Sequence, residues 1–528
     1  MNMNLNTNIN IKCKTLSLAI SLILASTTHL SVAQSKDLTA IKVELAAGQQ
    51  SASQVLQQYQ AKSAQLNLYL NAVTVLRDQA NQDARQADTK KEGRALLHGL
   101  PLMVKDNIAV QGMVTTAGSL ALAENMASED AFIVKRLREA GAIIAGKTNL
   151  SEWANFRSTK STSGWSSVGG QTRNPYDPRK SPCGSSSGSG AAVAAGMIPA
   201  AIGTETDGSI VCPAAVNGLV GLKPTLGLVS RAGIVPLSHS QDTAGPMTLS
   251  VRDAALLMNV IAGSDKNDPA TVDADRQRVA DYTAGLNPQA LKGKRLGLVK
   301  NLSSSYDKAT QQLLRDSIAI LKAQGAIIIE DIELPHLADL DKLELPVLLY
   351  DFKADLNQYL ASAPSQVKVR TMADVMRFNQ AHRQQVMPYF GQEIMQMAQA
   401  KGSLNAPPYQ TAATQAKLLA GPKGIDAVMQ QHQLDALIAP TTGPAWDINY
   451  KKGDVIAGSA SSPAAIAGYP HLTVPMGLVK GLPVGLSFFA GAWKDAELLN
   501  MGYAFEQARP ALPAPDLQRV QNKKFAKR

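Results

Sequence analysis

The chain has 528 residues, of which 45% are apolar and 18% charged, a composition typical of a globular protein with a large core. The formal net charge is +10, yet the basic residues are scattered and aromatic residues make up only 5%. Nucleic-acid binding is not expected, because it would need a basic surface interleaved with aromatic side chains. The seven histidines are dispersed and no CxxC or HExxH spacing occurs, so we expect no bound metal and no other cofactor.

The N-terminal segment has the three-part pattern of a secretory signal. Two lysines precede an apolar run from Leu16 to Ala25, and small residues come just before Gln34. The run is too short to span a bilayer stably, so an uncleaved membrane anchor is the weaker alternative. We expect residues 1–33 to be a signal peptide, and the mature protein to be periplasmic or secreted without stable membrane insertion.

Helices and buried strands are predicted to alternate along the first part of the mature chain. Apolar residues at helical intervals predict two surface helices within residues 36–66. The apolar run Leu102–Val104 predicts the end of a buried strand, directly before Lys105. Residues 128–141 predict a helix with Ser128 as its N-cap, and a second buried strand follows it.

The alternation continues through residues 189–225 and predicts an α/β fold, with a single large β-sheet covered on both faces by helices. Residues 290–330 predict strand, helix and strand. Residues 336–432 predict a mostly helical insertion, after which residues 434–442 resume the strand pattern. Because the segments on either side of the insertion share one pattern, we expect a single domain over residues 34–528.

Two serine-containing segments carry the strongest chemical signal. Residues 184–188 fit G-x-S-x-G with Ser186 at the centre, but the nucleophile elbow needs a preceding strand, and a proline-rich loop stands there instead. A flexible linker is disfavoured by the apolar segment that follows at once.

Ser209 follows an extended segment and precedes a helical one, so nearby backbone N–H groups could stabilise an oxyanion. The simpler alternative is that Ser209 only caps the helix.

A serine nucleophile needs a base, and the residues alone leave its identity open. His98 and His239 lie near apolar segments, but neither has a flanking acid that would complete a triad, so both are expected to be structural. A buried lysine can lose its proton because desolvation lowers its pKa. Lys105 is favoured because it ends a buried strand, and Lys147 and Lys223 remain rivals by the same reasoning.

Several motifs follow one another along the chain: "GLPLMVKD", "SPCGSSSGSGAAVAAG" and "GTETDGSIVCPAA", and after them "GLKPT", "DTAGPM" and "AGYPHLTVP". The first three resemble the lysine motif, the glycine-serine loop and the nucleophile motif of the amidase signature family, and the others follow in the order of that family. The resemblance covers most of the mature chain and is tightest over about residues 95–260, which would form the signature core. It implies the amidase signature fold.

The resemblance also implies a Ser-Ser-Lys triad, with Ser209 as nucleophile, Ser185 as the bridging serine and Lys105 as the base. Ser185 would follow a cis peptide bond. The mechanism implied is acyl transfer through an acyl-enzyme, with hydrolysis of a carboxamide C–N bond. The residues implied to form the oxyanion hole are Thr206, Asp207, Gly208 and Ser209.

Four residues depart from the usual family motifs: Cys183 and Ser187 in the serine loop, and Asp207 and Val211 in the nucleophile motif. None removes a catalytic atom, and together they favour the peptide amidase branch. The expected substrates are therefore small-molecule or peptide amides, above all C-terminal peptide amides that release ammonia. The walls of the substrate pocket would lie in residues 153–168 and in the helical insertion.

Other functions remain as alternatives. A broad-specificity acylamidase or a fatty-acid-amide hydrolase is the main alternative enzyme. An amidotransferase subunit is disfavoured by the signal peptide, because its partners are cytosolic. An exported binding protein on the same scaffold would be expected to lack part of the triad.

Two cysteines flank the candidate serines. Cys183 lies two residues before Ser185, and Cys212 three residues after Ser209. If the serines meet, the cysteines would be close, and in an oxidising compartment they could form a disulfide. The alternative, two buried thiols that act as small apolar fillers, is slightly favoured.

Overall fold

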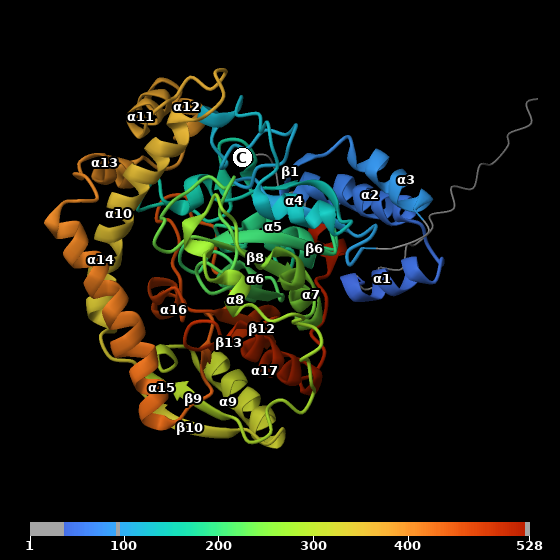
Figure 1. The fold of residues 1–528 in the computed structure, drawn as a ribbon, viewed down its shortest axis with the longest axis vertical. Coiled ribbons are helices and arrows are strands. Elements are labelled where there is room, and N and C mark those ends of the chain that lie inside the picture. Colours follow the sequence, from blue (N-terminus) through green and yellow to red (C-terminus); the bar gives the residue numbers. More distant parts are fainter. Residues whose placement is uncertain (1–35, 91–94, 523–528) are drawn as a thin grey trace, which may run out of the picture. The chain divides into compact units, whose positions relative to one another are not determined.

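The computed structural model describes residues 36–90 and 95–522, so the predicted signal peptide lies outside the described residues (Figure 1). Eleven strands form one sheet, and β4 (Trp165–Ser166) and β5 (Gly170–Gln171) form a separate short ribbon. In spatial order the strands of the sheet are β1 (Val73–Leu76), β3 (Ile143–Thr148), β2 (Pro101–Lys105), β6 (Ala200–Glu205), β8 (Thr243–Thr248), β7 (Val220–Lys223), β12 (His471–Val479), β13 (Leu482–Phe489), β11 (Ala436–Pro440), β9 (Arg295–Val299) and β10 (Ile327–Ile332).

The sheet is mixed. β2 lies between β3 and β6 and is parallel to both, and β9 lies parallel to β10 and β11. The six remaining strand pairs are antiparallel. β2, β3, β6 and β11 are buried along their whole length, which explains their continuous apolar runs in the sequence.

Helices cover both faces of this sheet, as the sequence predicts. Successive side chains of a strand point to opposite faces, so Leu472 and Thr473 of β12 mark the two sides. Gly502 lies against Leu472 on one face, and Ala215 lies beside Gly485 and Thr473 on the other. These contacts place α17 (Asp495–Ala508) and α6 (Val211–Val216) on opposite faces. The helices are α1 (Leu38–Ala46), α2 (Ala52–Leu70), α3 (Ala80–Thr89), α4 (Phe132–Glu139), α5 (Ser187–Ala194), α6 (Val211–Val216), α7 (Val251–Ile261), α8 (Ala274–Gln277), α9 (Lys308–Ala323), α10 (Leu337–Ala361), α11 (Met372–Ala381), α12 (Arg383–Val386), α13 (Glu393–Gln399), α14 (Pro407–Ala420), α15 (Ala427–His432), α16 (Ser462–Ala467), α17 (Asp495–Ala508) and α18 (Leu517–Asn522).

Residues 337–432 contain α10 to α15, and the two long helices α10 and α14 pack side by side (Figure 1). Both also contact α16, which follows the return of the chain to the sheet. Pro407 occupies the first turn of α14, where a missing backbone N–H is tolerated. Within residues 36–90 and 95–522, no helix combines the length and the apolar character needed to cross a membrane.

One predicted helix start is wrong. The helix predicted from Ser128 begins at Phe132, and Ser128 is not its N-cap. The backbone N–H of Ala131 donates to the carbonyl of Ala109 at 2.9 Å, and that of Phe132 donates to the carbonyl of Ala232 at 3.1 Å. These tertiary hydrogen bonds hold the preceding residues in an irregular conformation, which outweighs the local capping signal.

Candidate active site

Lys105 ends β2, inside the sheet, and its side chain is fully buried. Its Nζ lies 2.7 Å from Ser185 Oγ, 2.8 Å from Thr204 Oγ1 and 3.1 Å from the carbonyl oxygen of Thr204. Because β2 and β6 are parallel neighbours, Thr204 lies beside Lys105 at the same end of the sheet. The sheet therefore fixes the lysine against the serine loop.

Burial lowers the pKa of Lys105 to about 7, although the negative charges of Asp242 and Glu205 oppose the shift. The three contacts of Nζ can be made by the ammonium, with three donors, and also by the neutral amine. A neutral amine has two N–H donors and one lone pair. The two oxygens of Thr204 can accept the two N–H groups, which leaves the lone pair facing the Ser185 hydroxyl. Lys105 is thus placed to accept a proton from Ser185.

The serine loop holds Ser185 rigidly. The Gly184–Ser185 peptide bond is cis, as the family resemblance implies. Ser185 is fully buried, and its carbonyl accepts a hydrogen bond from the backbone N–H of Ser151 at 3.0 Å. A Cβ at Gly184 would lie 2.3 Å from Ser151 Oγ, so any larger residue there would require the Ser151 side chain to move. The neighbouring Ser186 instead binds β6 through Thr204, accepting from its N–H and donating to its carbonyl.

The turn at residues 206–209 joins β6 to α6 and carries Ser209, which is 7% exposed. Gly208 has φ +74°, a conformation that favours glycine. Glu205 accepts the backbone N–H groups of Ile210 and Val211 at 2.7 and 2.9 Å. In the part of the chain that the structure describes, the N–H groups of Asp207, Gly208 and Ser209 donate to no protein acceptor. They are therefore available to an oxygen of a bound substrate.

The structure brings Ser185 and Ser209 into adjacent segments but does not join their hydroxyls. The backbone N–H of Ser186 donates to the carbonyl of Ser209 at 3.2 Å, which fixes the serine loop against the turn. Among the described residues, Ser209 Oγ and Ser185 Oγ form no hydrogen bond within 3.5 Å. Catalytic hydrogen bonds are often long before substrate binds and shorten in the complex.

A disulfide between Cys183 and Cys212 joins the serine loop to α6. The expectation of two free thiols is therefore wrong. Their Cα atoms lie 6.0 Å apart, within the usual range for a disulfide. Burial and size do not distinguish a paired cysteine from a buried thiol, so the sequence favoured the wrong alternative.

The rival lysines are engaged elsewhere. Lys147 Nζ pairs with Asp106 at 3.1 Å and also donates to the carbonyl of Val114 and the hydroxyl of Thr115, both at 2.7 Å. These three acceptors suit a charged ammonium. Burial lowers the pKa of Lys223 to about 8, and its Nζ donates to the carbonyl of Pro224. Neither lysine has a hydrogen bond to a serine among the described residues.

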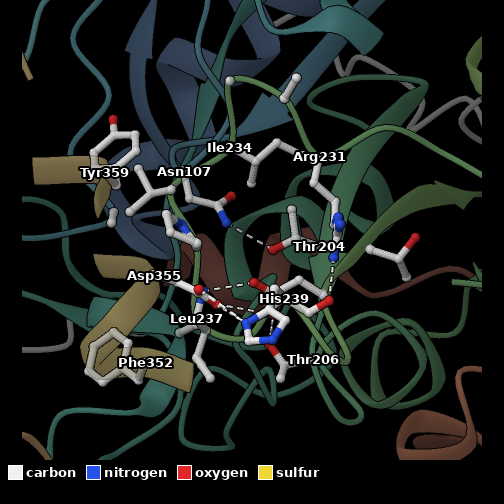
Figure 2. A pocket seen from close by; sticks show the side chains of 18 of the residues that line it. Asn107, Thr204, Thr206, Arg231, Ile234, Leu237, His239, Phe352, Asp355 and Tyr359 are labelled. Atoms are coloured by element: carbon white, nitrogen blue, oxygen red, sulfur yellow. Dashed lines mark hydrogen bonds and ion pairs between the residues drawn. The ribbon is translucent and has the colours of Figure 1, made fainter. Parts of the chain in front are cut away.

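A cavity of about 490 Å³ adjoins this constellation (Figure 2). Thr204 and Thr206 line it, whereas Lys105, Ser185 and Ser209 are not among its lining residues. Trp153 and Ala154 contribute to its wall, as does α10, so the two predicted wall segments do line the cavity. The lining side chains labelled in Figure 2 are Asn107, Thr204, Thr206, Arg231, Ile234, Leu237, His239, Phe352, Asp355 and Tyr359.

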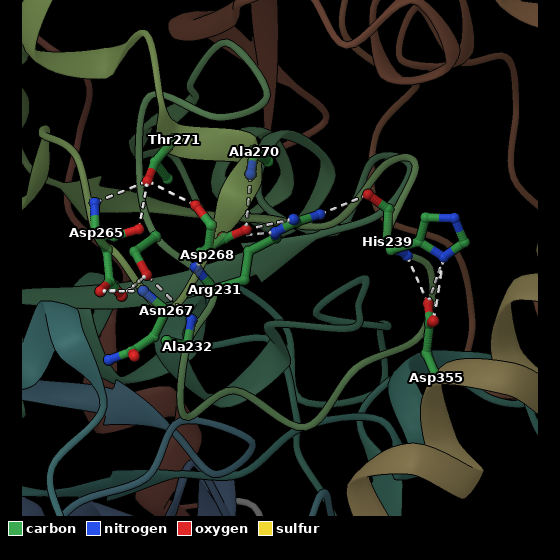
Figure 3. Close-up of polar contacts among 10 residues, drawn as sticks. Arg231, Ala232, His239, Asp265, Asn267, Asp268, Ala270, Thr271 and Asp355 are labelled. Atoms are coloured by element: carbon green, nitrogen blue, oxygen red, sulfur yellow. Dashed lines mark hydrogen bonds and ion pairs between the residues drawn. The ribbon is translucent and has the colours of Figure 1, made fainter.

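The sequence did not predict that residues 231–243 form another wall of this cavity. Figure 3 shows the two ion pairs that hold this segment, from Arg231 to Asp268 at 2.6 Å and from His239 to Asp355 at 3.0 Å. Hydrogen bonding to Asp355 raises the pKa of His239. His239 thus has an acid partner after all, which lies 116 residues further along the chain on α10. These hydrogen bonds attach the 231–243 segment to α10.

Asp242 connects the same segment to the 206–209 turn. Thr206 Oγ1 donates to one carboxylate oxygen at 2.6 Å, and the N–H groups of Leu237 and Ser238 donate to the other. Burial raises the pKa of Asp242 to about 6.

Across residues 36–90 and 95–522, no cluster of three or more His, Cys, Asp or Glu side chains could hold a metal ion.

Comparisons with known proteins identify the family to which this chain belongs. The amidase family model matches residues 54–499. The crystal structure of native peptide amidase from Stenotrophomonas maltophilia is 48% identical, with a TM-score of 0.87 over 91% of this chain and 98% of that one. A structure of the peptide amidase PAM with the competitive inhibitor chymostatin is 49% identical, with a TM-score of 0.88 over 91% and 99% of the two chains. A probable amidase from Arabidopsis thaliana is 36% identical over 498 residues, 92% of this chain and 91% of the relative. This chain therefore belongs to the amidase signature family and is a hydrolase that acts on amide C–N bonds.

Proposed function

We propose that the protein hydrolyses C-terminal peptide amides through an acyl-enzyme on Ser209, with Ser185 and Lys105 as the proton relay. The observation that carries the proposal is the contact of 2.7 Å between Lys105 Nζ and Ser185 Oγ, in a site where burial lowers the pKa of the lysine to about 7. A general base is most effective when its pKa lies near the working pH. No histidine is needed for this relay.

In the proposed reaction, neutral Lys105 accepts the Ser185 proton while Ser185 accepts the proton of Ser209. Ser209 Oγ attacks the carboxamide carbon, and the unengaged N–H groups of the 206–209 turn stabilise the oxyanion. The proton then returns through Ser185 to the leaving nitrogen, and ammonia departs. Water hydrolyses the acyl-enzyme by the same relay in reverse order.

The choice of peptide amides rests on the relatives and on the cavity. The two solved relatives at 48 and 49% identity are named peptide amidases. The cavity beside Thr204 has an apolar and aromatic wall that includes Trp153, Phe352 and Tyr359, which suits an apolar side chain of a peptide.

Ammonia release from a panel of substrates tests the proposal. The panel contains C-terminal peptide amides, simple aliphatic amides, fatty amides and glutamine. Peptide amides are expected to have the highest kcat/KM, and Ser209→Ala to abolish turnover while the protein stays folded. Ser304→Ala, on a surface segment away from the site, is the matched control. Preference for fatty amides would favour the alternative hydrolase, and full activity of folded Ser209→Ala would exclude the nucleophile.

We also propose that residues 1–33 are removed on export and that residues 34–528 form a single amidase domain outside the cytoplasm. The disulfide between Cys183 and Cys212 supports an oxidising compartment. N-terminal sequencing of the mature protein from a periplasmic or culture fraction should begin at Gln34. A mature chain that retains Lys12 would contradict cleavage.

A further inference from the structure

Glu344 of α10 lies against the turn that carries Ser209, although it belongs to the helical insertion. The side chain of Gln241 bridges the two, because its Nε2 donates to Glu344 Oε1 at 2.9 Å and to the carbonyl of Thr206 at 3.3 Å. Gln241 is only 3% exposed, so this bridge is well shielded from water. Through this bridge Glu344 lies next to the residue that precedes Asp207, and the Asp207 carboxyl acts on the Glu344 carboxyl.

Asp207 has one satisfied and one unsatisfied oxygen. Its Oδ2 accepts a hydrogen bond from Ser462 Oγ at 2.6 Å, at the start of α16. Its Oδ1 is buried and receives no hydrogen bond from the donors of the described residues. Buried oxygens without a donor are rare in proteins, so Asp207 Oδ1 is free to accept a hydrogen bond from a neighbouring donor.

A proton on Glu344 supplies the missing donor. Two adjacent carboxylates cannot both ionise without strong repulsion, and a carboxylic acid has one O–H donor. Burial and the charge of Asp207 raise the pKa of Glu344 well above its usual range. The charges that act on Glu344 from its own helix and from the turn are those of Asp341 and Asp207, and both are negative. Asp207 in turn acts on the buried Glu205 and Lys223.

We propose that protonated Glu344 is a positioning residue that holds the Asp207–Ser209 turn in its reactive conformation by donating a hydrogen bond to Asp207. This inference rests on the proposed function of Ser209. Asp207 is two residues from the nucleophile, and its backbone N–H is one of the three that are unengaged. When Glu344 loses its proton, the hydrogen bond becomes a repulsion between two carboxylates. Amide hydrolysis should therefore fall on the alkaline side as Glu344 ionises.

Glu344→Gln separates the hydrogen bond from the titration. The glutamine Nε2 can donate to Asp207 at any pH, while its Oε1 still accepts from Gln241. Glu344→Ala removes the donor. The matched control is Asp339→Asn, which removes an exposed acid from the same helix. The measurement is kcat and KM for a peptide amide between pH 6 and 10.

The wild type should show an acid limb near pH 7 from Lys105 and an alkaline limb from Glu344. Glu344→Gln should keep the acid limb, lose the alkaline limb and retain kcat within about threefold. Glu344→Ala should lose at least about tenfold in kcat, because a misplaced reacting group is costly, with a smaller change in KM. An alkaline limb unchanged in Glu344→Gln, or wild-type kcat in Glu344→Ala, would overturn the proposal.

A readout independent of activity separates this proposal from the proposed function. Because the folded state binds the Glu344 proton more tightly, wild-type stability should fall relative to Glu344→Gln as pH rises from about 4.5. Urea unfolding of the two proteins at several pH values measures the difference. A constant difference would reject the shared proton even if the enzyme is active. A pH-dependent difference in a protein without amide turnover would reject only the proposed function.

Discussion

Replacing Lys105 with methionine should abolish activity and change how stability depends on pH. The ordinary lysine pKa of 10.5 and the folded-state value of about 7 differ by an amount equivalent to about 5 kcal/mol. Because the folded state binds fewer protons than the unfolded state between these values, this group makes the wild type more stable as pH rises through that window. Methionine has a similar length and does not titrate.

The size of the effect follows from the same values. Between pH 7 and 9.5, wild-type stability should rise by about 3 kcal/mol relative to Lys105→Met. At pH 7 the variant should be more stable than wild type by about 2 to 4 kcal/mol, because it no longer buries an amine whose pKa is lowered. Little is lost in exchange, since Thr204 keeps Asn107 and Ser186 as donors and only the Ser185 hydroxyl loses its partner. Amide turnover should fall at least about 100-fold.

Urea unfolding at intervals between pH 7 and 9.5 gives the stability difference, and ammonia release gives the activity. The other lysines are common to both proteins, so their titration cancels in the difference. Parallel stability curves for the two proteins would show that Lys105 has an ordinary pKa. Turnover by folded Lys105→Met would remove the lysine from the mechanism.

Three further predictions concern stability. Replacing Cys183 and Cys212 together with alanine should cost about 3 to 4 kcal/mol in urea unfolding, since the disulfide closes a loop with a sequence separation of 29; an unchanged midpoint would contradict this. Gly188→Ala should destabilise by about 3 kcal/mol or more, because its Cβ would lie 2.3 Å from a backbone oxygen, whereas Gly285→Ala meets nothing within 4 Å and should be nearly neutral. The raised pKa of His239 makes the contribution of this residue to stability largest below pH 6.5. In urea unfolding, wild type should therefore be more stable than His239→Asn by less than about 1 kcal/mol, and this difference should shrink as pH rises to 8. A difference that grows with pH would contradict the raised pKa.

Local signals led only part of the way to the site. The apolar run before Lys105 indicates a buried strand and favoured this lysine without excluding Lys147 and Lys223, and the choice of Lys105 and the role of Ser185 came from the resemblance to the amidase signature family. Ser185 and Ser209 each lie in short motifs with glycines that permit a tight approach of the backbone. The alternation of helices and strands likewise predicted the covered sheet, because periodicity reports which faces are buried.

The contacts between the insertion and the sheet could not be predicted from the sequence. Glu344 lies 103 residues from Gln241, and Asp355 lies 116 residues from His239, so no spacing rule relates them. On α10 these acids resemble surface residues of an ordinary amphipathic helix. Ser128 failed for a related reason, because the hydrogen bonds that replace its cap come from loops distant in sequence.

Chemistry and substrate recognition are divided between two parts of the chain that could change at different rates. The strands and turns that carry Lys105 and Ser209 are constrained by the sheet, whereas α10 contributes one part of the cavity wall, including Phe352 and Tyr359. An engineer who exchanges the insertion for that of a relative should therefore obtain new selectivity on an unchanged reaction centre. The exchange has one condition. The hybrid must have an acid at position 344 together with aspartate at position 207, or an acid at neither position. A hybrid that ignores this pairing should fold and bind but turn over slowly.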